Sequence, residues 1–235
     1  MNMIVQGIQE AFRLIITLDQ EVFEVVTLSL KVSLISLFIA TLVSIPLGII
    51  FVRKEFKGKH FLMRMIYTLM GMPPVLCGLF VYIMFMRQGP FGSLRLNYTV
   101  TIMIIAQVLL IIPIILGLTI NAVRDKEKRI TMLAKTLGAS RLDTFKLFIY
   151  EVRIGLLTAI ISGFSRAISE VGAVMIVGGN IDGKTRVMTT YISQLKGMGE
   201  FERAVAVGII LLLISFTMNT ILYNFQKEKS DIGEH

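Results

Sequence analysis

Hydrophobic residues gather into five long runs that short polar segments separate. The runs cover residues 25–52, 61–86, 99–120, 152–177 and 205–223. A helix needs roughly 20 apolar residues in a row to cross the ~30 Å hydrocarbon core of a bilayer, and each run has about that length or more. The pattern therefore predicts an all-α membrane protein with five transmembrane helices.

The first residues of the chain follow a different pattern, in which polar side chains are interspersed among apolar ones. The apolar positions that recur at helical spacing are Ile4, Ile8, Phe12 and Ile15. The polar residues among them are Gln6, Gln9, Glu10 and Arg13. This periodicity predicts an amphipathic helix over residues 4–18 that lies in the membrane interface. The segment lacks the basic start and the small-residue cleavage site of a secretory signal.

The composition agrees with a chain that lies mostly in lipid. Hydrophobic residues make up 54% and charged residues 17% of the 235 residues, and the mean hydropathy is +0.75. A soluble domain averages about 25% charged residues, so this excess of apolar residues does not fit one water-soluble domain. The single cysteine, Cys77, excludes an internal disulfide and a cysteine-based metal cluster, and we expect it to be a packing residue.

Lysine and arginine residues are distributed unevenly between the two sides of the predicted helices. Residues 53–64 and 124–153, together with Lys227 and Lys229, carry most of the chain's 24 basic residues. Short loops rich in Lys and Arg stay in the cytoplasm. We therefore expect the N-terminus outside the cell and the C-terminus in the cytoplasm. The net charge of +8 reflects this topology and is poor evidence for nucleic acid.

Residues 178–185, Gly-Gly-Asn-Ile-Asp-Gly-Lys-Thr, match the phosphate-binding pattern G-x-x-x-x-G-K-[ST] at every defined position. The segment falls on the outer side, where there is no ATP pool, and no strand ending in a magnesium-binding Asp follows it. We therefore reject a nucleotide site and predict a tight turn at an outer mouth. Its backbone N–H groups can face an anion, or the turn is a plain connection. The residues assigned to this mouth are Gly178, Gly179, Asn180, Thr185 and Arg186.

The fourth run sorts into stripes when it is read as a helix. Hydroxyl residues share one stripe, Thr158, Ser162, Ser165 and Ser169. Small residues form a neighbouring stripe that permits close helix packing, Gly155, Ala159, Gly163 and Ala167. Large apolar residues cover the opposite side, which we expect to face lipid, Leu157, Ile160, Ile161, Phe164, Ile168 and Val171.

Arg166 and Glu170 lie between the polar and small stripes, one helical turn apart, so they can pair. An Arg near mid-bilayer costs about 2.5–3.5 kcal/mol, so it should face protein or water. One interpretation is that the pair, with Ser162 and Ser169, shapes an anion path or its gate. The other is that it is a buried ion pair that fixes helix register. The sequence leaves both open.

Prolines interrupt two of the runs. Pro73 and Pro74 fall within the second run and Pro113 within the third. Because proline lacks a backbone N–H, it should kink or break a helix. Such breaks can expose backbone at a substrate cavity, or they bend helices around their neighbours. We assign only Pro73 and Pro74 to the translocation path.

The long basic segment 133–151 has the features of a docking element. Its apolar residues recur at helical spacing, and Gly138 divides it, which predicts a helix, a turn and a second short helix. Ala134, Gly138 and Ala139 offer small surfaces that a partner can approach closely. A solvated amphipathic loop is the alternative.

The run A-K-T-L-G-A-S-R-x-x-T-F at residues 134–145 resembles the cytoplasmic EAA loop of binding-protein-dependent ABC importer permeases. In that family the loop inserts into a groove on a separate ATPase subunit. The resemblance covers roughly residues 25–225, although Met132 stands where Glu is usual and Tyr150-Glu151 where Leu-Pro is usual. It assigns ATPase docking to Ala134, Leu137, Gly138, Ala139, Ser140 and Phe145.

Finer matches resemble the oxyanion branch of that family, and the tungstate permeases above all. They are M-G-M-P-P-V at 70–75, G-P-F-G at 89–92, R-A-I-S-E-V-G-A-V-M-I-V-G-G-N-I at 166–181 and T-R-V-M-T-T at 185–190. Molybdate and sulfate permeases are similar in a looser form. The resemblance implies the type I ABC importer permease fold and import of a tetrahedral oxyanion by alternating access, most simply tungstate.

The sequence thus predicts three parts: an interfacial helix at 1–20, a permease domain at 21–225 with its coupling loop at about 124–151, and a cytoplasmic tail at 226–235. The expected partners are a second copy of the chain, two copies of an ABC ATPase, an extracytoplasmic oxyanion-binding protein and membrane lipid in a prokaryotic cell membrane. A stand-alone channel or ion-driven carrier is the second hypothesis. His60 and His235 are isolated, so no catalytic residue, metal or cofactor is expected in this chain, and a membrane enzyme is the third and weakest hypothesis.

Overall fold

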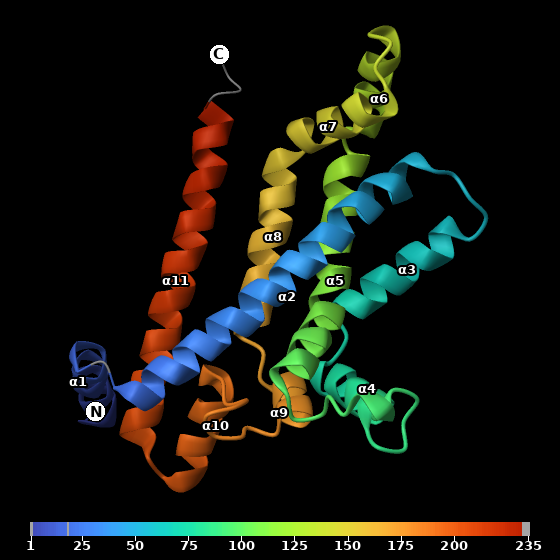
Figure 1. Cartoon of the computed structure of the whole chain (residues 1–235). Helices are drawn as coiled ribbons and strands as arrows, with labels where there is room; N and C mark the ends of the chain where they lie inside the picture. The colour runs from blue at the N-terminus through green and yellow to red at the C-terminus, as the bar shows by residue number, and fades with distance from the viewer. Residues whose placement is uncertain (1, 18, 232–235) are drawn as a thin grey trace. The chain divides into compact units, whose positions relative to one another are not determined.

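The structure is a computed structural model that describes residues 2–17 and 19–231, and the regular structure of these residues is helical throughout (Figure 1). The helices, in chain order, are α1 (Asn2–Ile16), α2 (Gln20–Arg53), α3 (Lys59–Met70), α4 (Pro74–Phe85), the short 3-10 helix η1 (Gly92–Leu94), α5 (Val100–Arg124), α6 (Glu127–Thr136), α7 (Arg141–Glu151), α8 (Arg153–Ile168), α9 (Gly172–Gly178), α10 (Met188–Met198) and α11 (Phe201–Asp231). The all-α prediction is confirmed for this part of the chain.

Three of the described helices are long and apolar enough to cross a membrane alone, and they cover Gln20–Arg53, Val100–Arg124 and Phe201–Asn224. The number rises to five if each of two bent pairs, α3 with α4 and α7 with α8, counts as one span. The helices α2, α5 and α11 cover the first, third and fifth apolar runs. Helix α5 continues through Pro113, so this proline does not break its helix.

The fourth apolar run is not one helix, which corrects the prediction for residues 152–177. Helix α8 ends at Ile168, and α9 begins at Gly172. Residue 172 must be small, because a Cβ atom there would lie 2.8 Å from Cγ2 of Val75. The break is local to residues 169–171, and Glu170 accounts for the new helix start because its Oε1 accepts a bond from the N–H of Ala173.

By its contacts the chain divides into two compact units. One comprises Met1–Ser36, Pro73–Gln107 and Ser165–Met218, and the other comprises Leu37–Met72, Val108–Phe164 and Asn219–His235. We call them the first and second unit. In the first, a core that includes Met103, Ala173 and Val177 joins α4, α5 and α9. In the second, a core around Ile49 and Phe148 joins α2 to the α6–α7 region.

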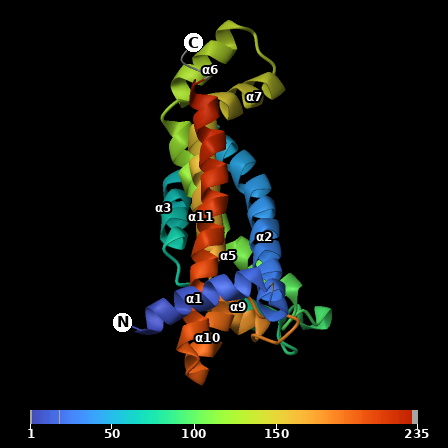
Figure 2. The same ribbon diagram turned by 90° about the vertical axis from the view of Figure 1, so that its left-hand side faces the viewer.

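Helix α1 lies across the N-terminal part of α11 within the first unit (Figures 1 and 2). Gly7 permits this contact, because a Cβ atom there would lie 2.5 Å from Cγ1 of Val205. The predicted apolar positions Ile8, Phe12 and Ile15 are exposed on the other side of α1. The amphipathic helix is therefore present, and its place in the membrane interface stays a prediction. Residue 18 and residues 232–235, which include His235, lie outside the described residues.

Candidate functional site

Arg166 and Glu170 form the ion pair that their spacing predicts. Arg166 Nη1 donates to Glu170 Oε2 across 2.7 Å, and the side chain of Glu170 is 1% exposed against 29% for Arg166. The other carboxylate oxygen, Oε1, accepts a 2.8 Å bond from the backbone N–H of Ala173 in the first turn of α9. Glu170 therefore satisfies an otherwise unpaired N–H group of α9 and places negative charge at that helix's N-terminus while it pairs with Arg166.

The main chain of Glu170 is also fixed. Thr189 Oγ1 in α10 donates to the carbonyl oxygen of Glu170 across 2.7 Å. A cavity of about 10 Å³, room for about one water, lies beside these groups. Its polar lining consists of Ser29, Ser33, Gln107, Glu170 and Thr189. The carboxylate thus lies in a small polar cavity inside the first unit.

Gln107 is a polar residue at this site that the sequence analysis did not single out. Its Nε2 donates to the carbonyl oxygen of Ala167 across 2.9 Å, near the C-terminus of α8. Its Oε1 is buried and accepts no hydrogen bond from the described residues. The sequence did contain a signal for this residue, since Gln107 is a lone amide side chain inside the apolar run 99–120. A polar group in a transmembrane helix usually bonds across helices.

Three hydroxyl residues of the predicted polar stripe, Thr158, Ser162 and Ser169, bond to the backbone of α8. Ser162 Oγ donates to the carbonyl oxygen of Thr158 across 2.9 Å, and Ser169 Oγ donates to that of Ser165 across 2.8 Å. The side chains of Thr158 and Ser169 are exposed. Since each hydroxyl proton is used locally, these side chains present acceptor lone pairs outward instead of donors. An anion requires donors, and these three hydroxyl groups offer it none in this arrangement.

The other two stripes of the fourth run differ in outcome. Ala159 and Gly163 are buried, and a Cβ atom at Gly163 would lie 2.7 Å from Cδ1 of Ile115, which confirms close packing of the small stripe. Phe164 and Ile168 are 0% and 5% exposed. The prediction that these two face lipid is wrong, because α8 ends at Ile168 and both side chains are enclosed by the chain itself.

Pro73 and Pro74 break the second run as predicted. Pro74 is the first residue of α4, and Pro73 precedes it as the N-cap residue. The carbonyl oxygen of Pro73 accepts from the N–H groups of Leu76 and Cys77 across 3.0 and 3.2 Å. Farther along α4, Gly78 permits close approach to α9, because a Cβ atom there would lie 2.6 Å from Cα of Ala173. The proline break, α9 and Glu170 are thus brought together within the first unit.

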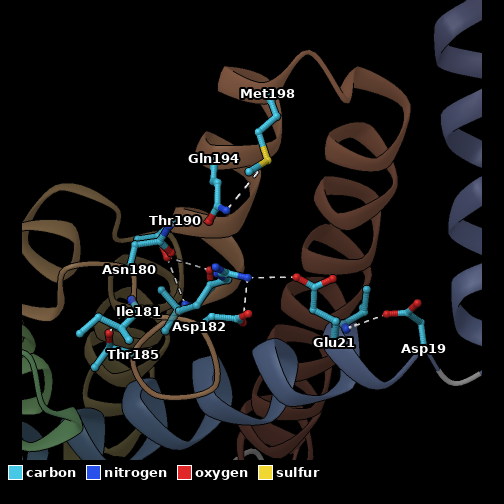
Figure 3. A network of polar contacts seen from close by, with 12 residues as sticks. Asp19, Glu21, Asn180, Ile181, Asp182, Thr185, Thr190, Gln194 and Met198 are labelled. Carbon is cyan, nitrogen blue, oxygen red and sulfur yellow. Dashed lines mark hydrogen bonds and ion pairs between the residues drawn. The ribbon is translucent and has the colours of Figure 1, made fainter.

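The turn predicted at residues 178–185 is present and tightly bonded (Figure 3). Gly179 and Asn180 adopt positive φ values of 71° and 51°. Thr185 Oγ1 donates to the carbonyl oxygen of Gly178 and accepts a 2.9 Å bond from the N–H of Ile181. Asn180 Nδ2 donates to Gln194 Oε1 in α10 across 2.7 Å. These bonds join the turn to its own Thr185 side chain and to α10.

The guanidinium group of Arg186 is paired with acidic side chains and is therefore not free to bind an anion. Its Nη1 lies 3.0 Å from Glu21 Oε1 and 2.8 Å from Asp182 Oδ1. Its side chain is only 11% exposed. Of the two interpretations of the turn, this pairing favours a structural connection at Arg186.

The segment 127–151 in the second unit forms the helix, turn and helix that Gly138 predicts. Gly138 has φ +63°, which favours glycine, and Ser140 caps α7 by accepting a 3.2 Å bond from the N–H of Asp143. Large apolar side chains near the turn are exposed, with Leu137 at 76%. Met132, Leu133 and Leu142 are exposed as well. We call these four residues the apolar tip.

Not every predicted docking residue lies at that surface. Ala134 is 4% exposed and belongs to the interior of the segment, and Phe145 packs against the core of the second unit. Ala139 is half-buried, whereas Gly138 and Ser140 are exposed. The structure therefore leaves Leu137, Gly138 and Ser140 accessible and shows that Ala134 and Phe145 support the segment from within.

The family model described as "Binding-protein-dependent transport system inner membrane component" matches residues 44–230. This match contains the proline break, the Arg166–Glu170 pair and the whole helix–turn–helix segment. The chain belongs to this family. It is a permease subunit of the ABC importer class and has the type I permease fold.

Relatives of this permease align over nearly its whole length. The chain is 45% identical to the tungstate uptake system permease protein TupB of Peptoclostridium acidaminophilum, over 97% of this chain and 100% of that protein. It is 34% identical to the TupB protein of Campylobacter jejuni, over 97% and 95% of the two chains. It is 32% identical to a probable anion ABC transporter permease protein of Haloferax volcanii, over 86% and 89%.

The permease also contains a charge network that sequence reasoning missed. Arg203 Nη2 lies 2.8 Å from Glu21 Oε2 and 3.5 Å from Asp19 Oδ1. Both Arg186 and Arg203 lie over the ring of Tyr191, at 5.5 and 5.9 Å from its centroid. Burial raises the pKa of Tyr191, and a hydrogen bond to Glu21 raises it further. The network could not be predicted from local sequence patterns, because Glu21 lies 165 residues from Arg186 in sequence.

Proposed function

We propose that this chain is the membrane-spanning subunit of a tungstate importer. The observation that carries the proposal is the 45% identity over 97% of the chain to a protein named as a tungstate uptake permease. Molybdate or sulfate is the alternative substrate, since all three are tetrahedral dianions. In this proposal selectivity lies mainly in the external binding protein.

The same proposal includes the partners that the chain itself lacks. Two copies of the permease bind two copies of an ABC ATPase and one extracytoplasmic binding protein. The apolar tip supports this, because Leu137 is 76% exposed at the end of a basic segment and its burial needs a partner surface. The N-terminus is outside and the C-terminus is in the cytoplasm. ATP binding closes the ATPases, moves the paired tips and turns the cavity outward, and hydrolysis resets it.

Within the membrane we assign a double role to Arg166 and Glu170. Glu170 fixes the start of α9, and the partly exposed Arg166 supplies positive potential to a passing dianion. The unequal exposure of the two side chains, 29% against 1%, supports this division. The Pro73–Pro74 break lets α4 approach α9 at Ala173, which links the proposed gate to α4.

Competition during uptake tests the substrate. The permease, its ATPase and its binding protein are expressed together in cells that lack their own oxyanion importers, and metal uptake is measured by mass spectrometry. We expect tungstate accumulation that excess molybdate reduces only partly and sulfate leaves unchanged. Preferred accumulation of molybdate or sulfate would replace the proposed substrate and leave the importer class intact.

A further inference from the structure

The segment between α4 and α5, residues 86–99, is a folded outer loop in the proposed topology and carries charge that is not neutralised. It contains Arg87 and Arg95, both exposed, and no acidic residue. Neither guanidinium lies within ion-pair distance of an acidic side chain in the described part of the chain. This contrasts with Arg186 and Arg203, which are paired with Glu21.

The loop folds back onto the end of α4. The N–H groups of Gly89 and Phe91 donate to the carbonyl oxygens of Met86 and Met84 across 2.7 and 2.9 Å. Gly92 must lack a side chain, because a Cβ atom there would lie 2.5 Å from the carbonyl oxygen of Met86. These contacts cover the negative end of α4, which would otherwise repel an anion.

Two non-glycine residues of the loop adopt left-handed backbone conformations. Arg95 has φ 50° and Tyr98 has φ 63°. Tyr98 is held by a 2.9 Å bond from its N–H to the carbonyl oxygen of Val177 and by a 3.1 Å contact between its hydroxyl and that of Tyr82. Such conformations are energetically unfavourable for non-glycine residues and cluster at functional sites. These contacts hold Tyr98, and the backbone of Arg95 is held by a 3.2 Å bond from its N–H to the carbonyl oxygen of Gly92.

An open cavity of about 520 Å³ lies between these groups. Its lining is Tyr82, Phe85, Met86, Arg87, Gly92, Arg95, Asn97 and Tyr98. Small-molecule sites measure about 300–1,000 Å³, so the space admits a small hydrated anion. Guanidinium groups present planar N–H donors that match oxyanions. The hydroxyls of Tyr82 and Tyr98 bond to each other, which leaves one O–H donor for a ligand.

We propose that this cavity is a binding site for a tetrahedral oxyanion, with Arg87 and Arg95 as its charged donors. The ligand is the transported dianion before it enters the membrane path, or the phosphate of an outer-leaflet lipid, because both present the same oxygens. The inference rests on the proposed function only for the identity of the dianion. The site is separate from Arg166, which lies in the last turn of α8 and does not line this cavity.

Arginine modification tests the site without any transport step. The purified full-length permease reacts with phenylglyoxal, and mass spectrometry measures the rate at each arginine. We expect tungstate, at twice its Kd, to slow modification of Arg87 and Arg95 about threefold relative to chloride of equal ionic strength, since protection follows 1 + [L]/Kd. Arg13, whose side chain is 73% exposed, is the internal control and should react at an unchanged rate. In Arg95→Gln the protection of Arg87 should be lost.

Two sample conditions separate the sources of the anion. Protection by tungstate in delipidated detergent solution identifies the free dianion, and protection only by added phospholipid identifies the lipid phosphate. Absence of protection by either, or protection only by the binding protein, overturns the site. If tungstate uptake by the intact transporter is normal in that case, the proposed function stands and this inference alone fails.

Discussion

Arg166 and Glu170 are joined across 2.7 Å with unequal exposure, the glutamate side chain 1% and the arginine side chain 29% exposed. Because the second oxygen of Glu170 bonds to the N–H of Ala173, the glutamate connects the end of α8 to the start of α9. The pair therefore has a structural part and an accessible part.

Removing one member of this pair should destabilise the permease. Glu170→Gln leaves Arg166 unpaired and Arg166→Gln leaves a buried carboxylate, so each should lower the free energy of unfolding by about 3 kcal/mol, the lower end for breaking a buried pair. The double variant should recover much of this loss but transport poorly, because the charge of Arg166 is gone. Thermal unfolding followed by circular dichroism and oxyanion uptake check the two parts.

Glu200→Gln, at an exposed position, is the matched control and should change stability by less than about 0.5 kcal/mol. Full transport by a stable double variant would show that Arg166 supplies no charge to the path. If the single variants were as stable as the control, the ion pair would contribute nothing to the free energy of unfolding.

Leu137 should be an anchor for the ATPase. Since its side chain is 76% exposed, Leu137→Ser should leave the permease fold intact. Loss of a buried anchor costs about 2 kcal/mol, so ATPase binding should weaken about 30-fold. Quantitative co-purification measures this effect. Phe56→Ser, at an exposed apolar residue in the loop before α3, is the control, and equal retention of the ATPase by both variants would contradict the docking assignment.

The topology predicts opposite labelling at two exposed lysine positions. After Cys77→Ala, a cysteine replacing Lys184 should react with a membrane-impermeant maleimide in intact cells, because the proposed topology places the turn after α9 outside. A cysteine replacing Lys135 in α6 should react only after the cells are opened. Reversed labelling would invert the orientation and would place residues 178–185 in the cytoplasm.

Tyr191 should make stability depend on alkaline pH. Its pKa is raised in the folded state by burial and by the hydrogen bond to Glu21, so its stabilisation is complete below the unfolded pKa of about 10 and is lost as pH rises toward the folded value. The permease should therefore begin to lose its stability advantage over Tyr191→Phe as the pH rises from about 9 to 11, and the loss should continue at higher pH. Melting curves followed by circular dichroism across this range measure the difference, and parallel pH slopes would contradict it.

Local signals were sufficient to predict much of the fold. The helices α2, α5 and α11 follow apolar runs long enough to cross a bilayer, Pro73 and Pro74 break the second run, and Gly138 divides α6 from α7. Each of these features depends on a few neighbouring residues. The break after Ile168 was missed because residues 169–171 carry no helix-breaking signal, and it depends on bonds from Glu170 to α9 and α10.

The candidate site was predictable only where its residues are neighbours in sequence. The Arg166–Glu170 pair follows from helical spacing alone. The pairing of Arg186 with Glu21 joins residues far apart in the chain, and Ala134 turned out to face the interior because tertiary packing decides which side of α6 is covered. The burial of individual side chains and the ion pairs between distant residues depend on tertiary packing, so sequence patterns alone do not predict them.

The central claim is that this permease imports an oxyanion only as part of an ATP-driven complex, and uptake by proteoliposomes tests it most directly. Vesicles contain the permease and its ATPase, with ATP on the ATPase side and the binding protein and tungstate on the other. We expect tungstate to accumulate only when ATP, ATPase and binding protein are all present, and not in vesicles with a permease carrying Leu137→Ser. Accumulation at the same rate without the ATPase or without ATP would contradict the account and identify a channel or carrier.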